Sequence, residues 1–160
     1  MPGGVAIGRA GLEDLPALLA VQKEAFLSEA VIYQDFNIPP LREPPGEIAA
    51  EFASKIFLKA ELKGEIVGAV RAGLMGRSCM IWKLAVLPGH RQQGIGSALL
   101  RACEELFPGA DGCELFTGHR SVANIRLYEQ LGYARVREQE LSPSLTLVYM
   151  RKSKEDGIRD

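Results

Sequence analysis

The segment LPGHRQQGIGSALLRACEELF (87–107) combines residue types that can bind an anion. Gly94 and Gly96 fall at the start of an amphipathic helix, although glycine is a poor helix former. No Asp or Glu occupies the first turn, and Arg91 stands just upstream. A helix N-terminus carries about half a positive charge and several unpaired N–H groups. The amides of residues 92–96 are therefore expected to converge on an oxyanion, because glycine places no Cβ in the way.

Three known kinds of glycine-rich segment could account for the spacing of these glycines. A dinucleotide-binding GxGxxG segment requires glycine where this chain has Leu99. A phosphate-binding loop matches the spacing of Gly89 and Gly94, but Ile95 replaces the lysine that would contact the γ-phosphate. Glycines that only ease a tight junction between strand and helix remain an alternative. The spacing that survives, Arg-x-x-Gly-x-Gly, suits a diphosphate, and Ser97 would add a hydroxyl.

The elements around this segment are predicted from hydrophobic periodicity and from the positions of Gly and Pro. A strand, a helix and a strand follow one another over 78–118, with a connection long enough for a right-handed crossover between parallel strands. In such a sheet the helix begins beyond the carboxyl end of a strand, where open α/β sheets bind ligands. Residues 27–46 contain four prolines, aromatic residues and acids, and are expected to form an ordered loop of low regularity that could include a helical turn. The other predicted strands are 5–10, 56–62, 65–75, 133–141 and 144–152, and the other predicted helices are 11–26, 47–55 and 121–132 with Ser121 as N-cap.

Length, charge and cysteine content restrict the class of protein. The 160 residues predict one domain, and a net charge of −1 gives no general attraction to nucleic acid or to anionic membranes. No apolar run approaches the roughly 20 residues of a membrane span and no signal peptide is recognisable, so we expect a cytoplasmic protein. Cys79, Cys103 and Cys113 lie in apolar segments without CxxC spacing and are expected in the core. The chain has two histidines and no clustered ligands, which predicts no metal site.

Two stretches together resemble the GNAT superfamily of acyl-CoA N-acyltransferases. KLAVLPGHRQQGIGSALL (83–100) is similar to the strand, loop and helix that bind CoA in that family, and NIRLYEQLGYARV (124–136) is similar to its second motif. The resemblance implies an α/β (α+β) fold whose mixed central sheet has about six or seven strands, with about four helices. It implies a single domain over 1–152, followed by a charged tail over 153–160 that we expect to fray. Acetyl-CoA is the implied co-substrate.

The resemblance also assigns roles to residues in both stretches. The main chain of Leu84, Ala85 and Val86 would hydrogen-bond the pantetheine arm as an added strand and polarise the thioester carbonyl. Asn124 and Tyr128, which share a helix face at i and i+4, would contact the CoA arm and the thioester sulfur respectively. A core position for Tyr128 is the structural alternative. The residues expected to hold the diphosphate are Arg91, Gln92, Gln93, Gly94, Ile95, Gly96 and Ser97.

Acyl transfer to an amine needs two proton transfers. A primary amine has a pKa near 10.4, so its deprotonation at pH 7 costs about 4–5 kcal/mol unless a base assists. The leaving thiolate can take a proton from an acid with a pKa near 10, a role that Tyr128 would fill. The three cysteines lack a sequence context that would activate a nucleophile. We therefore expect direct transfer in a ternary complex, without an acyl-enzyme.

The base and the acceptor are less defined by the sequence. Some family members carry a glutamate on the strand just before the Leu-x-Val segment, where this chain has Trp82 and Lys83. Candidate carboxylates are Glu29 and Asp35, with His119 as a weaker candidate base. Tyr33 is expected to line the acceptor pocket together with Phe36, unless the two side chains form a lid on the core. Each of the charged candidates could instead be a solvated surface residue.

The sequence thus predicts an N-acetyltransferase that moves an acetyl group from acetyl-CoA to a primary amine. The alternative is a CoA-binding regulatory domain without catalysis, which the missing strand glutamate would favour. A structural interaction domain that binds no CoA is the third possibility. The hairpin over 133–152 could pair across a homodimer, although no residue pattern demands it.

Overall fold

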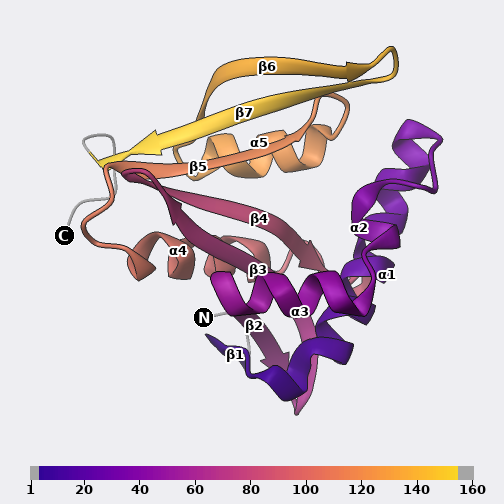
Figure 1. Ribbon diagram of the computed structural model, residues 1–160, viewed down its shortest axis with the longest axis vertical. Coiled ribbons are helices and arrows are strands. Elements are labelled where there is room, and N and C mark those ends of the chain that lie inside the picture. The colour runs from indigo at the N-terminus through magenta and orange to yellow at the C-terminus, as the bar shows by residue number, and fades with distance from the viewer. Residues whose placement is uncertain (1–3, 155–160) are drawn as a thin grey trace.

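A computed structural model describes residues 4–154, which form a seven-stranded sheet in the order β1-β2-β3-β4-β5-β7-β6 (Figure 1). Within this range no helix has the length and apolar character needed to cross a membrane. The strands are β1 (Val5–Arg9), β2 (Ile56–Leu62), β3 (Glu65–Met75), β4 (Ser78–Val86), β5 (Gly112–Gly118), β6 (Ala134–Ser142) and β7 (Leu145–Ser153). The helices are α1 (Leu15–Tyr33), α2 (Pro39–Arg42), α3 (Pro45–Ser54), α4 (Ile95–Leu106) and α5 (Val122–Gln130), with short 3₁₀ turns at Leu12–Asp14 and Pro88–His90.

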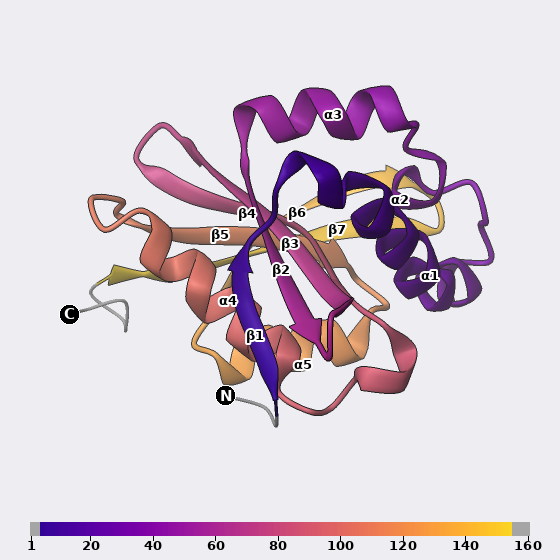
Figure 2. The ribbon, with the colours of Figure 1, turned by 90° about the horizontal axis from the view of Figure 1, so that it is seen from below.

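Helices lie on both faces of the sheet. Seen along the sheet, α1, α2 and α3 lie on one side and α4 and α5 on the other (Figure 2). Helix α4 packs its buried residues Ile95, Leu99, Leu100 and Cys103 into the main core. On the opposite side, α1 buries a smaller cluster against the sheet, in which Leu18 contacts Phe57 and Ile48. The chain thus has the layered α/β fold that the resemblance implies.

The two halves of the sheet meet at β4 and β5. These strands run parallel and pair over only three residue pairs, from Ser78–Gly112 to Met80–Glu114. All other neighbouring strands are antiparallel and pair over five or more residues. The carboxyl-terminal part of β4 therefore leaves β5, and the sheet opens toward the start of α4.

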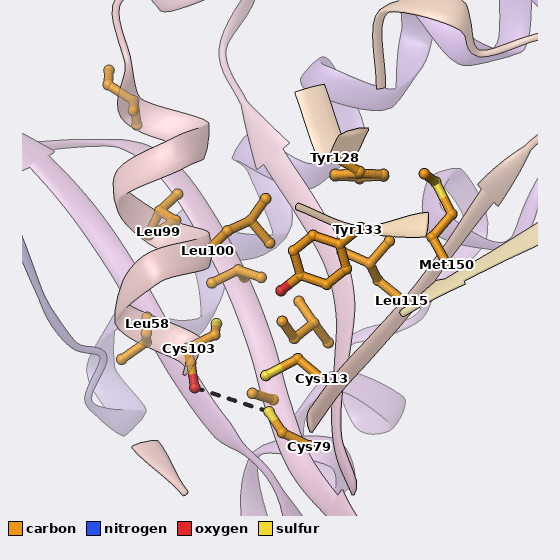
Figure 3. Packing of buried hydrophobic residues seen from close by; sticks show 14 of the residues in the cluster. Leu58, Cys79, Leu99, Leu100, Cys103, Cys113, Leu115, Tyr128, Tyr133 and Met150 are labelled. Carbon is orange, nitrogen blue, oxygen red and sulfur yellow. Dashed lines mark hydrogen bonds between the residues drawn. The ribbon is translucent and has the colours of Figure 1, made fainter. Parts of the chain in front are cut away.

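The three cysteines lie in the core, as predicted. Each is free and at most 2% exposed. Cys79 and Cys113 are cross-strand neighbours on β4 and β5, and the Cys79 thiol points at the carbonyl of Cys103, with a separation of 3.9 Å between sulfur and oxygen (Figure 3). Burial raises the pKa of the Cys103 thiol, so this group remains an inert thiol.

The predicted strands match the observed strands to within one residue at each end. The turn at Lys63–Gly64 is also confirmed, since both residues have positive φ (53° and 82°), as a two-residue hairpin turn requires. Ser153, predicted to belong to the tail, instead ends β7. Residues 155–160 of that tail lie outside the described residues, as do residues 1–3.

The prediction of an irregular loop over 27–46 is wrong for its first part. Helix α1 continues to Tyr33, because residues 27–33 contain no Gly or Pro that would stop it. The helix ends where Gln34 adopts the left-handed conformation and its N–H donates to the carbonyls of Ala30 and Val31. Glu29 and Tyr33 are therefore held on a helix rather than on a loop.

Candidate active site

The free edge of β4 forms one wall of the candidate site. Beyond Met80 the strand has no partner on its β5 side, so the main chain near Leu84 can hydrogen-bond another molecule. A β-bulge lies at this point, because Lys83 and Leu84 together oppose one residue of β3. Lys83 takes a left-handed conformation there (φ 54°). Such bulges re-aim the backbone and are frequent next to active sites.

The loop after β4 presents unpaired amides to the same opening. Gln92 (φ 61°) and Gly94 (φ 83°) adopt left-handed conformations, and Gly94 is the N-cap of α4. Within the described residues, no amide from Gln92 to Gly96 donates a hydrogen bond. Alternating backbone conformations of this kind form an anion-binding concavity, which the helix dipole reinforces.

Gly96 keeps the space between β4 and α5 narrow but open. A Cβ at this position would lie 3.4 Å from the Leu127 side chain and 3.8 Å from that of Leu84. Any larger side chain would fill the gap between the free edge of β4 and α5. This is the path that an extended chain would follow from the loop amides toward β5.

An open groove of about 590 Å³ continues around the N-terminus of α4. Gln93, Gly94 and Ser97 line it together with Arg101, one helical turn after Ser97. Arg101 and, one turn later, Glu105 add a cation and an anion to this groove, and neither was among the predicted site residues. The spacing of Arg101, four residues from Ser97 on the same helix, was the available signal.

Tyr128 and Asn124 lie on α5, behind this gap. Tyr128 is 5% exposed, and burial, followed by the negative charge of Glu29, raises the pKa of its hydroxyl. Among the described residues every fully buried side-chain N or O atom has a partner, yet the Tyr128 hydroxyl makes no hydrogen bond there. The hydroxyl is therefore free to bond a further group. The Asn124 amide donates to the Thr117 hydroxyl of β5 (3.2 Å).

A chain of hydrogen bonds places Glu29 near the opening between β4 and β5. The Arg120 amide donates to the Tyr33 hydroxyl (3.0 Å), Tyr33 donates to Ser121 Oγ (2.7 Å), and Ser121 donates to Glu29 Oε1 (2.5 Å). Gly118 makes this possible, because any side chain there would overlap the Tyr33 hydroxyl. The second oxygen of Glu29 makes no hydrogen bond or ion pair with the described residues.

Residues 18–133 match the model of the acetyltransferase (GNAT) family. The chain belongs to this family. Acetyltransferase ECA0875 of Pectobacterium atrosepticum is 36% identical over 83 residues, which cover 51% of this chain and 59% of that protein. The chain spans between 37 and 59% of the length of three curated relatives that it matches.

Solved structures of the GNAT fold superpose on nearly the whole chain. The PaiA N-acetyltransferase from Thermoplasma acidophilum, in complex with coenzyme A, has a TM-score of 0.79 at 20% identity and covers 93% of this chain and 98% of its own. The yncA structure from Salmonella typhimurium, with its cofactor acetyl-CoA, has a TM-score of 0.72 at 20% identity and covers 94% of both chains. At these identities the likeness establishes the fold, and both of these relatives carry CoA or its acetyl ester.

Arg91, the first residue of the family's glycine-rich motif, is placed differently from the expectation. Its guanidinium donates to the carbonyl of Ala25 (2.6 Å), to Ser28 Oγ (3.1 Å) and to the carbonyl of Val86 (3.2 Å). The side chain therefore fastens the loop to α1 and to the end of β4. In this arrangement Arg91 holds the loop that carries the amide concavity, and the start of α4 adds the positive end of a helix dipole there.

The side chains of the other candidates from the sequence make local contacts. The Asp35 carboxylate accepts the Asn37 amide (2.9 Å) and stabilises its own turn, and Phe36 is 64% exposed. His119 Nδ1 accepts the Thr146 amide (3.0 Å), which fixes the imidazole against β7. Ser121 occupies the predicted N-cap position of α5, but its hydroxyl bonds Glu29 and makes no capping hydrogen bond.

Lys83, which stands where some family members have glutamate, belongs to a buried ionic cluster. Arg71 of β3 donates to both oxygens of Glu43 (2.7 and 3.0 Å) and to the side-chain oxygen of Gln22 (2.6 Å). The Lys83 ammonium lies 3.3 Å from Glu43. The cluster thus ties α1 and the segment before α3 to the bulge of β4. Sequence reasoning missed it, because its members are far apart in the chain.

The pKa of Glu43 makes this cluster pH-dependent. Burial alone would raise the pKa, but hydrogen bonds from Arg71 and Gln22 and the charges of Arg71 and Lys83 outweigh it and lower the pKa to about 2. A carboxyl whose pKa falls on folding stabilises the protein above its unfolded pKa, near 4.5, and loses that contribution as the pH falls toward 2.

Glu43→Gln should therefore lower the free energy of unfolding by about 2–3 kcal/mol at pH 7, because buried Arg71 would keep only the partly exposed Glu51 (3.1 Å) as a charge partner. The variant should also lose less stability than the wild type between pH 4.5 and pH 2. Urea denaturation followed by circular dichroism measures both effects. Glu47→Gln on the exposed side of α3 is the matched control, expected within about 0.5 kcal/mol of wild type. A Glu43 variant as stable as this control would contradict the assignment.

Proposed function

We propose that this chain transfers an acetyl group from acetyl-CoA to a primary amine within one ternary complex. The observation that carries the proposal is the unpaired edge of β4, which leads to the amide concavity at residues 92–96 and faces α5 across the gap at Gly96. A diphosphate needs several N–H donors without obstructing side chains, and the loop supplies them. A pantetheine arm needs a free strand edge, and β4 supplies it.

Side chains of this protein can carry out both proton transfers, one to the departing sulfur and one from the attacking amine. Tyr128 keeps its proton at neutral pH because its pKa is raised, so it can donate to the departing sulfur. Glu29 has a carboxylate oxygen without a partner among the described residues, and it can accept a proton from the attacking amine or attract its ammonium form. The N–H groups near the β4 bulge would stabilise the negative charge that develops on the carbonyl oxygen.

Glu29→Gln should reduce kcat/KM for amine acetylation by roughly 10–10³-fold while leaving acetyl-CoA affinity unchanged. Glutamine can still accept the hydrogen bond from Ser121, so the variant removes the charge and keeps the shape. Thiol release from acetyl-CoA, measured with a panel of primary amines, gives kcat/KM, and calorimetry gives the affinity.

Glu24→Gln is the matched control, since Glu24 lies on the same helix and is exposed. A Glu29 variant with wild-type kcat/KM would remove Glu29 from the mechanism. Tight CoA binding without thiol release on any amine would favour the non-catalytic regulatory domain instead.

A further inference from the structure

The side of the sheet that carries α1 and α3 is uncovered over β5, β7 and β6. In Figure 1, α3 lies in front of the other half of the sheet, whereas no helix stands in front of β6 and β7. Phe116 of β5 is 37% exposed on this face. Its neighbour two residues on, Gly118, contacts Tyr33 of α1, so Phe116 points to the same side as the hydrogen-bond chain that ends at Glu29.

Three side chains form a continuous shelf that begins beside this opening. The Phe116 and Tyr149 rings lie 5.3 Å apart, and the Arg137 guanidinium lies 4.0 Å from the centre of the Tyr149 ring. We call Phe116, Tyr149 and Arg137 the aromatic shelf. The Tyr149 hydroxyl donates to Gln139, which fixes the ring. The shelf thus presents an apolar surface followed by a cation.

Among the described residues of β5, β7 and β6, this face carries more positive than negative charge. Glu114 is the acid there, and it pairs with Arg137 (3.1 Å) and lies 4.0 Å from Arg151. Two guanidinium groups thus share one carboxylate. The Arg137 side chain remains 56% exposed. Arg135, by contrast, pairs with Glu129 of α5 on the opposite side of the sheet. The shelf therefore has an accessible positive charge that an anionic group can complement.

We propose that the acceptor is a short peptide-like primary amine whose amino group lies beside Glu29 and whose carboxylate binds Arg137, with an apolar side chain on Phe116 and Tyr149. This inference rests on the proposed function. From Gly118, beside Tyr33, to Arg137 is roughly 12 Å, since Phe116 lies about 6.6 Å along β5 and Arg137 lies two strand spacings of about 4.8 Å further across the sheet. At 3.3–3.6 Å per residue, about three residues span this distance, whereas a single amino acid does not.

The test is a calorimetric titration of peptides into the protein saturated with CoA, which cannot transfer an acetyl group. The probes are Ala-Leu-Ala with a free carboxylate, the same peptide with an amidated C-terminus, and an amidated pentapeptide with Asp in third place. The free acid and the Asp peptide should bind roughly five- to tenfold more tightly than the amidated tripeptide. If only the free acid gains, the source is a C-terminal carboxylate; if the Asp peptide gains equally, an internal acidic residue suffices.

Arg137→Gln should abolish the preference for a carboxylate and leave the affinity for the amidated tripeptide within twofold. Arg135→Gln, on the same strand but the other face, should preserve the preference. Equal affinities for all three peptides would contradict the proposal that the aromatic shelf binds a carboxylate. Equal effects of the two variants on the carboxylate preference would contradict it as well. Thiol release with acetyl-CoA separates the two proposals. Turnover of all peptides without preference would refute the shelf alone, and carboxylate-dependent binding without turnover would refute the acetyl-transfer proposal and the acceptor role.

Discussion

Replacing Tyr128 by phenylalanine should lower kcat by roughly 10²–10⁴-fold and leave the affinity for acetyl-CoA within twofold. The substitution removes one oxygen and keeps the ring, which packs 6.3 Å from the Tyr133 ring. Without the hydroxyl, the sulfur must leave as a thiolate or take its proton from water. Because the pKa of Tyr128 is raised, ionisation of this group should also cause no fall in wild-type rate between pH 7 and pH 9.

Tyr133→Phe provides the matched control for Tyr128→Phe. Tyr133 lies in the same core (Figure 3), but its hydroxyl donates to Glu104 of α4 (2.8 Å). Its removal should cost stability and change kcat by less than about threefold. Steady-state thiol release and thermal unfolding measure the two quantities. A Tyr128 variant with unchanged kcat would assign Tyr128 to packing, the alternative that its 5% exposure allows.

Gly94→Asp should weaken acetyl-CoA binding by roughly 10²-fold or more. The variant puts a negative charge into the amide concavity, where a unit charge at about 4–5 Å from a phosphate costs about 3 kcal/mol at an effective dielectric constant near 20–30. Isothermal titration of CoA gives the affinity directly. High salt should recover part of the loss, because exposed charges are screened.

The Gly94→Asn variant separates the effect of the added charge on CoA affinity from the effect of backbone strain. Asn and Asp have the same shape, and both tolerate the left-handed conformation that Gly94 adopts (φ 83°) better than other side chains do. The Asn variant should therefore bind CoA at least tenfold more tightly than the Asp variant. Equal affinities of the two variants would mean that the concavity does not bind an anion.

Local patterns in the sequence predict most of this fold. Alternating and continuous apolar runs mark strands such as 65–75, and glycine or proline ends them. The prediction failed at 27–33, where the absence of a helix breaker should have outweighed the prolines that begin at Pro39. The bulge at Lys83 could not be predicted, because it depends on how β3 and β4 align rather than on either sequence alone.

The two sides of the candidate site differ in how far the sequence defines them. The proposed cofactor side is a continuous segment, 84–97, whose main chain would bind the cofactor, so its position follows from the motif. The acceptor side brings together Glu29 of α1, Ser121 at the start of α5 and Phe116 of β5, which only the folded chain makes neighbours. Arg91 shows the limit of the motif. The residue type was expected, but its guanidinium binds the Ala25 carbonyl rather than facing the amide concavity.

A crystal structure of the protein with CoA would test most directly whether the amides of Gln92–Gly96 bind the diphosphate. The account predicts at least three of these amide nitrogens within about 2.7–3.2 Å of phosphate oxygens, with the pantetheine arm along Leu84–Val86. A diphosphate bound elsewhere, with the amides of this loop facing solvent, would contradict it.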